Sequence, residues 1–300
     1  MKVEIIANPV AGSGKGARLA RSLRTALAHA KLHETSIAQN AESLARERTK
    51  NGAETLIVVG GDGTISEAMN GILTAGQKSL PKVAILPAGT GGDFRRTFAL
   101  TNDITSFVRQ LNQGRTRRID LGQLVYRDFK NRRCERFFSN VCSFGLGGLT
   151  DQLVEASPKW IGGRAAFFLG AVRATLAHQP IPIGLRLDDQ ELPLANFSNV
   201  AICNGRYFGG GMRIAPDASP DDGLFDVITI EGSKAQTLSL AATIYAGTHL
   251  KRPGVSHYRA KKVEAFQPQG REVLLDVDGE PLGRLDLRVS NRKRCIELIV

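Results

Sequence analysis

Over the first 120 residues, short apolar runs alternate with longer segments whose apolar residues recur at helical spacing. The short runs, rich in β-branched side chains, predict strands at residues 2–7, 35–38, 55–59 and 82–86. The longer segments predict helices at residues 16–31, 41–50, 65–74 and 103–112. This order predicts an α/β domain, a parallel sheet flanked by helices, with ligands at the carboxyl ends of its strands.

Beyond about residue 120 the pattern changes to alternating strands separated by turn sequences. Polar turns typical of hairpins occur at residues 128–131, 188–190 and 278–280. Helical spacing returns at residues 159–178 and 234–246. We therefore expect a second domain that is mainly antiparallel β, sandwich-like, with a few helices.

A length of 300 residues is about twice that of an ordinary domain, which agrees with a division into two. We expect the α/β domain at residues 1–120 and the mainly β domain at residues 121–293. Residues 294–300 have the pattern of a strand, and the pattern leaves open whether this strand returns to the first domain.

Composition and charge narrow the classes of partner. Hydrophobic residues make up 42% of the chain and charged residues 23%, as in globular proteins. Lys and Arg outnumber Asp and Glu by 40 to 29, and the net charge of +11 favours nucleic acid, an acidic membrane surface or a phosphorylated ligand as partner. The basic residues are dispersed in pairs and triplets without an RNA-recognition or zinc-finger pattern. Binding to nucleic acid therefore rests on charge alone and is not expected.

The cysteines indicate the redox state of the compartment, and the lengths of the apolar segments indicate whether the chain crosses a membrane. The four cysteines form no C-x-x-C pair, so we expect reduced thiols in a reducing, cytoplasmic compartment rather than a disulfide scaffold or a metal cluster. The apolar helical segments fall short of about 18 residues, so no transmembrane segment is expected.

Glycine-rich turns follow three of the predicted strands, at residues 8–15, 60–64 and 89–93. Parallel strands would bring all three turns to one edge of the sheet. In the second turn, Thr64 and Glu67 have the spacing of a capping box, which predicts the start of a helix at Thr64. A glycine-rich turn before a helix N-terminus is typical of a phosphate-binding site.

Two common nucleotide-binding patterns are absent. The first turn is not a Walker A sequence, because Pro9 stands where the first Gly is required and Gly16 follows Lys15 where Ser or Thr would bind magnesium. The chain also lacks a G-x-G-x-x-G sequence with an acidic residue about 20 positions further on, which disfavours a dinucleotide-binding fold of the usual kind.

Short motifs along nearly the whole chain resemble, in order, the diacylglycerol kinase catalytic family of lipid kinases, in its soluble bacterial form. This family shares Gly-Gly-Asp-Gly with sphingosine kinases, NAD kinases and phosphofructokinases. The motifs are Asn8-Pro9 with Gly12, residues 60–64, residues 87–94, residues 140–145, Asn204 with residues 209–211, Pro216 with Ala218, residues 222–224 and residues 278–280. Each is weak alone, and their joint order carries the resemblance.

The resemblance implies roles for individual residues. Glu280 would be the catalytic general base, taking the proton of a lipid hydroxyl as it attacks the γ-phosphorus of ATP. The ATP site would be lined by Gly60, Gly61, Asp62, Gly63, Thr64, Ile65, Ser66 and Thr90, with a weaker case for Thr35. A magnesium ion would be held by Asp222 with the backbone carbonyls of Ser219 and Leu224, since Mg²⁺ seeks oxygen ligands.

Gly92 departs from the family pattern, which has Asn before the Asp that corresponds to Asp93. The Asn amide contact is absent, so we expect a freer loop there. Two alternatives to a lipid kinase stay open: a kinase of a soluble acceptor such as NAD, and a nucleotide-binding regulator without turnover. The chain contains no Asn-Glu dipeptide, which NAD kinases typically carry on the following helix, and Asp222 and Glu280 count against the regulator.

The expected partner is a lipid substrate at the membrane surface. A basic chain without a membrane span would dock transiently and peripherally on the inner, cytoplasmic face of an acidic bilayer. The oligomeric state is left open, a homodimer included.

Overall fold

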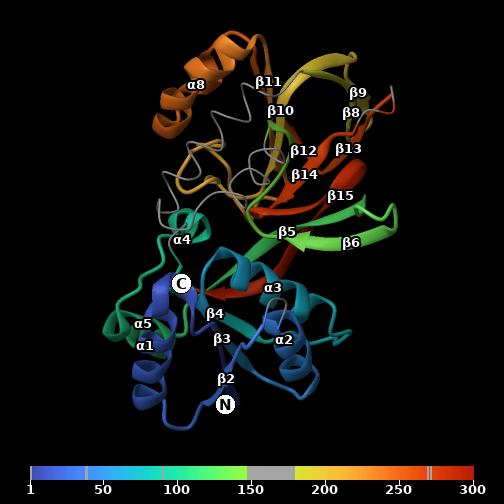
Figure 1. The fold of residues 1–300 in the computed structure, drawn as a ribbon. Helices are drawn as coiled ribbons and strands as arrows, with labels where there is room; N and C mark the ends of the chain where they lie inside the picture. Colours follow the sequence, from blue (N-terminus) through green and yellow to red (C-terminus); the bar gives the residue numbers. More distant parts are fainter. Residues whose placement is uncertain (1, 38–39, 90, 147–179, 269, 271) are drawn as a thin grey trace. The chain divides into compact units, whose positions relative to one another are not determined.

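The computed structural model describes residues 2–37, 40–89, 91–146, 180–268, 270 and 272–300 (Figure 1). The chain divides into two compact units, residues 1–120 with 294–300, and residues 121–293. Strands β5 (Thr116–Arg127) and β15 (Glu280–Ile299) each contribute residues to both units. The helix predicted at residues 159–178 lies outside the described residues.

The first unit contains a parallel sheet of the predicted kind. Its strands are β1 (Val3–Ala7), β2 (Lys31–Glu34), β3 (Thr55–Gly60) and β4 (Lys82–Pro87). They lie in the order β4-β3-β1-β2, and Leu298, near the end of β15, pairs in parallel with Val83 of β4. All residues of β1 and β3 are buried, which explains why their sequences are mainly apolar.

Helices follow the strands of this unit: α1 (Ala11–Ala26), α2 (Asn40–Lys50), α3 (Asp62–Leu73), α4 (Asp93–Phe98) and α5 (Ile104–Gln113). The predictions of residues 16–31 as a helix and 35–38 as a strand were wrong in their bounds. Leu27 and Ala30 pack into the core from the turn after α1, so they continued the helical spacing beyond the helix. Strand β2 is polar and partly exposed, so its sequence lacks the buried pattern.

The second unit is mainly antiparallel, so the expected fold class is confirmed. Neighbouring strands follow the order β12-β11-β10-β7-β14-β15, while β8 pairs with β10 and β13. The strands, besides β5 and β15, are β6 (Arg133–Phe138), β7 (Val141–Gly145), β8 (Ile181–Leu187), β9 (Gln190–Glu191), β10 (Ala195–Cys203), β11 (Phe225–Glu231), β12 (Val255–Ala260), β13 (Lys262–Phe266) and β14 (Leu274–Val277). All three predicted hairpin turns join paired strands, β5–β6, β8–β9 and β14–β15.

Apolar side chains from these strands form the core of the second unit. The rings of Phe138 and Phe225 stack with their centroids 5.7 Å apart, and Phe144 is fully buried among the same residues. Helix α8 (Lys234–Ala246) begins with a capping box at Ser233 and has the bounds that the sequence predicted. Within the described part of the chain, no helix has the length and apolarity needed to cross a membrane.

Candidate functional site

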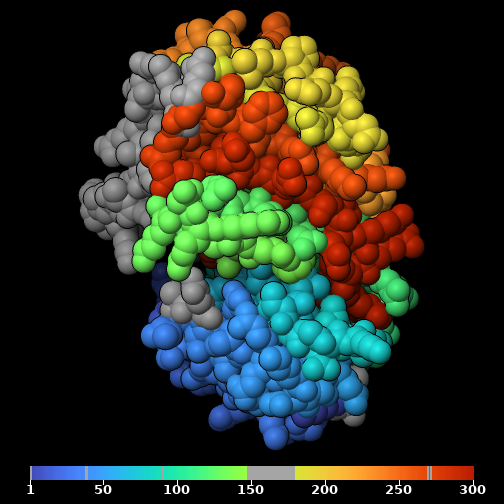
Figure 2. All heavy atoms as spheres, turned by 90° about the vertical axis from the view of Figure 1, so that its right-hand side faces the viewer, coloured from blue at the N-terminus to red at the C-terminus, as the bar shows by residue number. Residues whose placement is uncertain are grey.

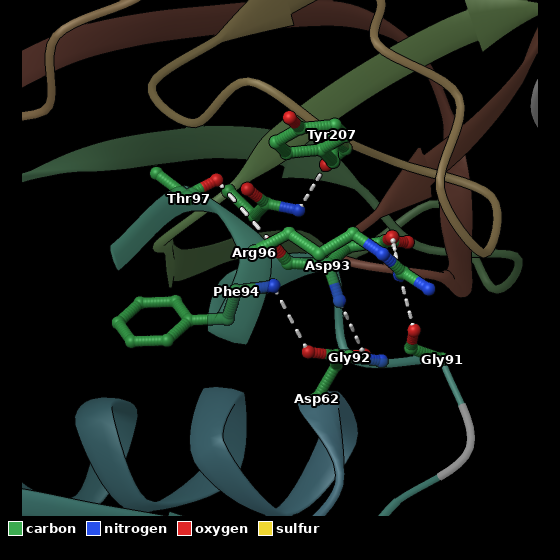
Figure 3. Close-up of polar contacts among 9 residues, drawn as sticks. Asp62, Gly91, Gly92, Asp93, Phe94, Arg96, Thr97 and Tyr207 are labelled. Carbon is green, nitrogen blue, oxygen red and sulfur yellow. Dashed lines mark hydrogen bonds and ion pairs between the residues drawn. The ribbon is translucent and has the colours of Figure 1, made fainter. Parts of the chain in front are cut away.

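The Asp62 carboxylate joins the second and third glycine-rich turns of the first unit. Its Oδ2 accepts hydrogen bonds from the backbone N–H groups of Gly92 at 2.7 Å and Asp93 at 3.2 Å, and its Oδ1 accepts from Phe94 at 3.1 Å (Figure 3). These are the free N–H groups at the start of α4, where a negative charge also meets the positive end of the helix dipole. Asp62 therefore caps α4 from a distant part of the sequence.

The backbones of the turns pack so closely that side chains are excluded between them. A Cβ on Gly89 would lie 2.5 Å from the Gly61 Cα, and a Cβ on Gly12 would lie 2.0 Å from the Ala88 carbonyl oxygen. The N–H of Ala88 donates to the Gly60 carbonyl at 2.8 Å. The three turns therefore meet at the carboxyl ends of β1, β3 and β4, as the parallel sheet predicted, and glycine is required where they touch.

Thr64 does not cap α3, so the prediction of a capping box there was wrong. The helix begins at Asp62, with Gly61 in an extended conformation before it. Thr64 is buried, and its Oγ1 accepts a hydrogen bond from the Asn8 side-chain amide at 3.2 Å. Glu67 accepts instead from the N–H of Ala41 at 3.1 Å. Both side chains serve contacts with other segments, which the local spacing cannot reveal.

The remaining residues predicted for the ATP site are placed as follows. Gly60 ends β3, and Gly63 lies in the first turn of α3. Ile65 and Ser66 are only 2% and 1% exposed, so their side chains pack inward. Thr35 follows β2 directly, and its N–H donates to the Ala7 carbonyl at 2.8 Å. Thr90 lies outside the described residues.

Two cations near the first turn share one neutral oxygen. With the Asn102 amide oriented to satisfy its neighbours, its oxygen accepts from Lys15 Nζ at 2.8 Å and from Arg95 Nη1 at 3.1 Å. Burial and the charges of Arg95 and Arg18 lower the pKa of Lys15. The sequence analysis missed this pair because Arg95 and Asn102 belong to no motif, although Lys15 lies in the first glycine-rich turn.

Glu280 lies directly after a tight hairpin turn of the second unit. The turn residues Asp278 and Gly279 have φ of 53° and 86°, and Val277 pairs with Glu280 across the hairpin, which is the geometry of a type I′ turn. Glu280 therefore begins β15 at a position fixed by the turn.

The Asp278 carboxylate anchors this hairpin. It accepts hydrogen bonds from the N–H groups of Ser139 at 2.8 Å, Asn140 at 2.9 Å and Val141 at 3.0 Å, and from the Ser139 hydroxyl at 3.1 Å. Burial raises the pKa of Asp278, and these hydrogen bonds act in the opposite direction. The Asn140 side chain in turn donates to the carbonyl of Tyr207. Motifs far apart in sequence thus meet around the Asp278 turn.

Arg136 forms an ion pair with Glu280 in the second unit. Its Nη2 lies 3.0 Å from the Glu280 Oε2, and the two side chains are 11% and 33% exposed. The guanidinium holds the Glu280 carboxylate in a defined position in this unit. Sequence reasoning missed Arg136, because it belonged to a dispersed basic group on β6 and only the pairing of the strands brings it to Glu280.

Two family models together match nearly the whole chain: the diacylglycerol kinase catalytic domain over residues 2–124, and the YegS C-terminal NAD kinase beta sandwich-like domain over residues 140–300. A diacylglycerol kinase of Mycobacterium tuberculosis is 30% identical over 283 residues, which cover 92% of this chain and 88% of the relative. The chain belongs to the diacylglycerol kinase catalytic family. A diacylglycerol kinase of Staphylococcus haemolyticus is 29% identical, with coverage of 98% and 86%.

Solved structures of diacylglycerol kinases and of NAD kinases share the fold. A diacylglycerol kinase from Bacillus anthracis has a TM-score of 0.73 at 20% identity, covering 99% of this chain and 96% of that one. Yeast NADH kinase complexed with NADH has a TM-score of 0.61 at 13% identity, covering 99% of this chain and 82% of that one. The family resemblance stated from the motifs is thereby confirmed, and the chain is a member of a kinase family.

The Gly92 of this kinase is held in place although it lacks the amide of the family pattern. It is in the left-handed conformation, with φ of 68° and ψ of 35°, and precedes α4. Its N–H is bound by Asp62, and Arg96 donates to the Gly91 carbonyl and to Asp93. These bonds hold the described part of the loop without an Asn amide, and the freer loop expected from the sequence stays a prediction.

The residues implied for magnesium lie in one turn of the second unit. Asp222 Oδ1 accepts from the Leu224 N–H at 2.9 Å, its Oδ2 pairs with Arg259, and its N–H faces the Ser219 carbonyl at 3.4 Å. Carboxylate and carbonyl oxygens fit a hard cation in chemical type. The fit requires Arg259, whose side chain is 47% exposed, to turn toward solvent. The described residues contain no cluster of three or more His, Cys, Asp or Glu that could hold a metal.

Proposed function

We propose that this chain is an ATP- and Mg²⁺-dependent lipid kinase that transfers the γ-phosphoryl group of ATP to a hydroxyl of diacylglycerol or a related lipid. The observation that carries the proposal is the end-to-end similarity to proteins named diacylglycerol kinase, over 92% of this chain. The packed glycine turns of the first unit and the fixed Glu280 of the second supply the two functions that such a transfer needs.

In the proposed reaction, the turns of the first unit bind the phosphates of ATP. The proposed phosphate contacts are backbone N–H groups at the start of α3, within residues 60–66. Thr90 and, with a weaker case, Thr35 are added to them by the family resemblance alone. The Asp62 carboxylate is occupied by three N–H groups of the neighbouring segment, so its role is to fix the loop that the nucleotide contacts. Lys15 and Arg95 add positive charge on the same unit.

Glu280 is the proposed general base. It accepts the proton of the lipid hydroxyl at a carboxylate oxygen, while Arg136 holds the side chain and the Asp278 turn holds the backbone. Magnesium, held by Asp222 with the carbonyls of Ser219 and Leu224, would neutralise phosphoryl charge or order the second unit. Positioned proton transfer contributes about 10² to 10⁴ in rate, and the remaining acceleration comes from alignment and electrostatic stabilisation.

The proposed site of action is the cytoplasmic face of the membrane, where the lipid acceptor resides. The net charge of +11 supports transient binding to an acidic bilayer. An acceptor in solution is the second candidate, because yeast NADH kinase and an NAD kinase from Archaeoglobus fulgidus in complex with ATP share the fold, the latter with a TM-score of 0.51.

Incubation with labelled ATP, Mg²⁺ and a panel of acceptors tests the proposal. The panel contains micellar diacylglycerol, other hydroxyl lipids and NAD. We expect phosphate transfer to a lipid, and Glu280→Gln lowers the rate by about 10² or more, since the amide cannot accept the proton. Glu135→Gln, on β6 beside Arg136, is the matched control and retains the rate.

Phosphate transfer to NAD and to no lipid would support the second candidate, a kinase of a soluble acceptor, in place of the lipid kinase. No transfer to any acceptor, or a Glu280→Gln rate within about threefold of the unaltered protein, contradicts the proposal.

A further inference from the structure

The hairpin between β5 and β6 carries an exposed aromatic side chain at its tip. Phe129 is 44% exposed, whereas the large apolar side chains of this unit are mostly buried. Residues 129–133 form a continuous exposed segment. Residues of this hairpin form part of the molecular surface, drawn in light green in Figure 2.

The turn that presents Phe129 is extensively bonded. Asp128 Oδ1 accepts from the N–H groups of Lys130 at 2.9 Å and Arg132 at 2.8 Å, and the Asn131 N–H donates to the Asp128 carbonyl at 2.9 Å. Arg284, from β15, donates to the Phe129 carbonyl at 2.6 Å. The backbone of the tip is therefore fixed from both sides, while the Phe129 side chain stays partly exposed to solvent.

Positive charge surrounds the exposed ring. Within residues 127–133 four side chains are cationic, Arg127, Lys130, Arg132 and Arg133, and all four residues are exposed. The single carboxylate of the segment, Asp128, pairs with Arg132 at 2.7 Å. The excess of positive charge at the tip therefore faces solvent.

We infer that this hairpin tip, residues 127–133, docks the kinase on an anionic bilayer. A single aromatic ring enters the interfacial region of a membrane, and the flanking cations attract the negative lipid headgroups. A protein partner would need a larger apolar area, whereas the ring and the cations complement a charged bilayer surface directly. The tip commits few side chains to other contacts, and the turn holds its shape before binding, which lowers the entropic cost of docking.

This inference rests on the proposed lipid acceptor, and it adds the surface by which the enzyme reaches that acceptor. The same chain offers a matched control. Leu194, before β10, is 56% exposed and thus at least as accessible as Phe129, but its neighbourhood in sequence contains Glu191 and no cation. If exposure alone determined binding to a bilayer, substitution at either position would lower the affinity. The proposed docking surface predicts a loss of affinity only for substitution of Phe129.

Co-sedimentation with vesicles tests the inference on the full chain. The vesicles contain either phosphatidylcholine alone or phosphatidylcholine with phosphatidylglycerol. We expect binding to the anionic vesicles only, weakened by salt. Phe129→Ser lowers the affinity by about tenfold, and Lys130→Gln with Arg133→Gln lowers it by roughly twenty-fivefold, at about fivefold for each cation. Leu194→Ser leaves the affinity unchanged, and circular dichroism checks that each variant is folded.

Activity separates this inference from the proposed function. Phe129→Ser should lower the rate on vesicle-borne diacylglycerol and retain the rate on a short-chain diacylglycerol dispersed as monomers. Unchanged vesicle binding in the Phe129 and Lys130/Arg133 variants overturns the docking surface even where the lipid kinase activity is present. Hairpin-dependent binding without phosphorylation of any lipid retains the surface and refutes the kinase proposal. Binding of the tip to nucleic acid or to another protein, with no affinity for anionic vesicles, also overturns the inference.

Discussion

Replacing Asp62 with Ala tests whether its carboxylate holds the glycine turns together. The change leaves the N–H groups of Gly92, Asp93 and Phe94 without their acceptor at the start of α4. A hydrogen bond to a charged group contributes about 1.5–3 kcal/mol, and the bonds share one carboxylate in a half-buried site, so we expect a loss of about 2–4 kcal/mol in the free energy of unfolding. Asp62→Asn keeps one acceptor oxygen and should lose about half as much.

Urea unfolding followed by circular dichroism measures this loss as a lower midpoint at constant slope. The matched control is Asp103→Ala, since Asp103 also caps a helix, α5, by accepting from the Ser106 N–H at 2.8 Å, but is exposed. Asp62→Ala should also raise the KM for ATP, because the loop that is proposed to contact the nucleotide loses its anchor. An Asp62→Ala variant as stable as Asp103→Ala would refute this account of the turns.

Three further predictions concern two glycines of the turns and the buried cysteines. Gly89→Ala should lower the free energy of unfolding by about 1–3 kcal/mol, and by more than Gly61→Ala does. The reason is that the added Cβ would lie 2.5 Å from the nearest backbone atom at Gly89 and 3.3 Å from it at Gly61. Thermal unfolding of the two variants measures the difference. Gly92→Asn should change the free energy of unfolding by no more than about 0.5 kcal/mol, since the nearest atoms to an added Cβ are 3.9 Å away and Asn accepts the left-handed conformation. Gly92→Val should cost about 1–2 kcal/mol, because a β-branched residue does not accept that conformation. Equal losses for the two variants in unfolding experiments would contradict this prediction. Burial raises the pKa of Cys142 and Cys203 well above the ordinary value of a thiol. At mildly alkaline pH only Cys134 and Cys295 should therefore react with a thiol reagent in the native protein, whereas all four cysteines should react in urea. Rapid reaction of Cys142 in the native protein would contradict this prediction and show that β7 opens.

Local sequence predicted the elements that are buried or capped by their own residues. The run Leu56 to Val59 is a strand because both faces are covered, and α8 begins at its Ser233 cap. The polar strand β2 escaped prediction because its pairing with β1 stabilises it, through register contacts such as Ile5 with Leu32, rather than any pattern of its own. Its neighbour α1 was misplaced by apolar residues that belong to the following turn.

The sequence predicted where the turns of the candidate site lie, but not which groups form hydrogen bonds within them. Glycines and carboxylates near strand ends identify the turns, since only these residues permit close backbone approach and tight hairpins. The partner of each carboxylate could not be predicted, because Asp62 bonds to Phe94 across 32 residues and Glu280 pairs with Arg136 across 144. Such contacts exist only after the strands have paired.

The hydrogen bonds to the Asp62 carboxylate weaken its electrostatic repulsion of an anion bound nearby. A free carboxylate would repel a phosphate about 4 Å away by about 4 kcal/mol at the effective dielectric of a protein surface. Three N–H groups at the positive end of α4 offset that charge while the carboxylate holds the turn. Asp278 follows the same principle in the second unit, where four donors surround one buried carboxylate beside Glu280. In both units a buried or half-buried acid thus fixes the backbone of a turn that belongs to the proposed site.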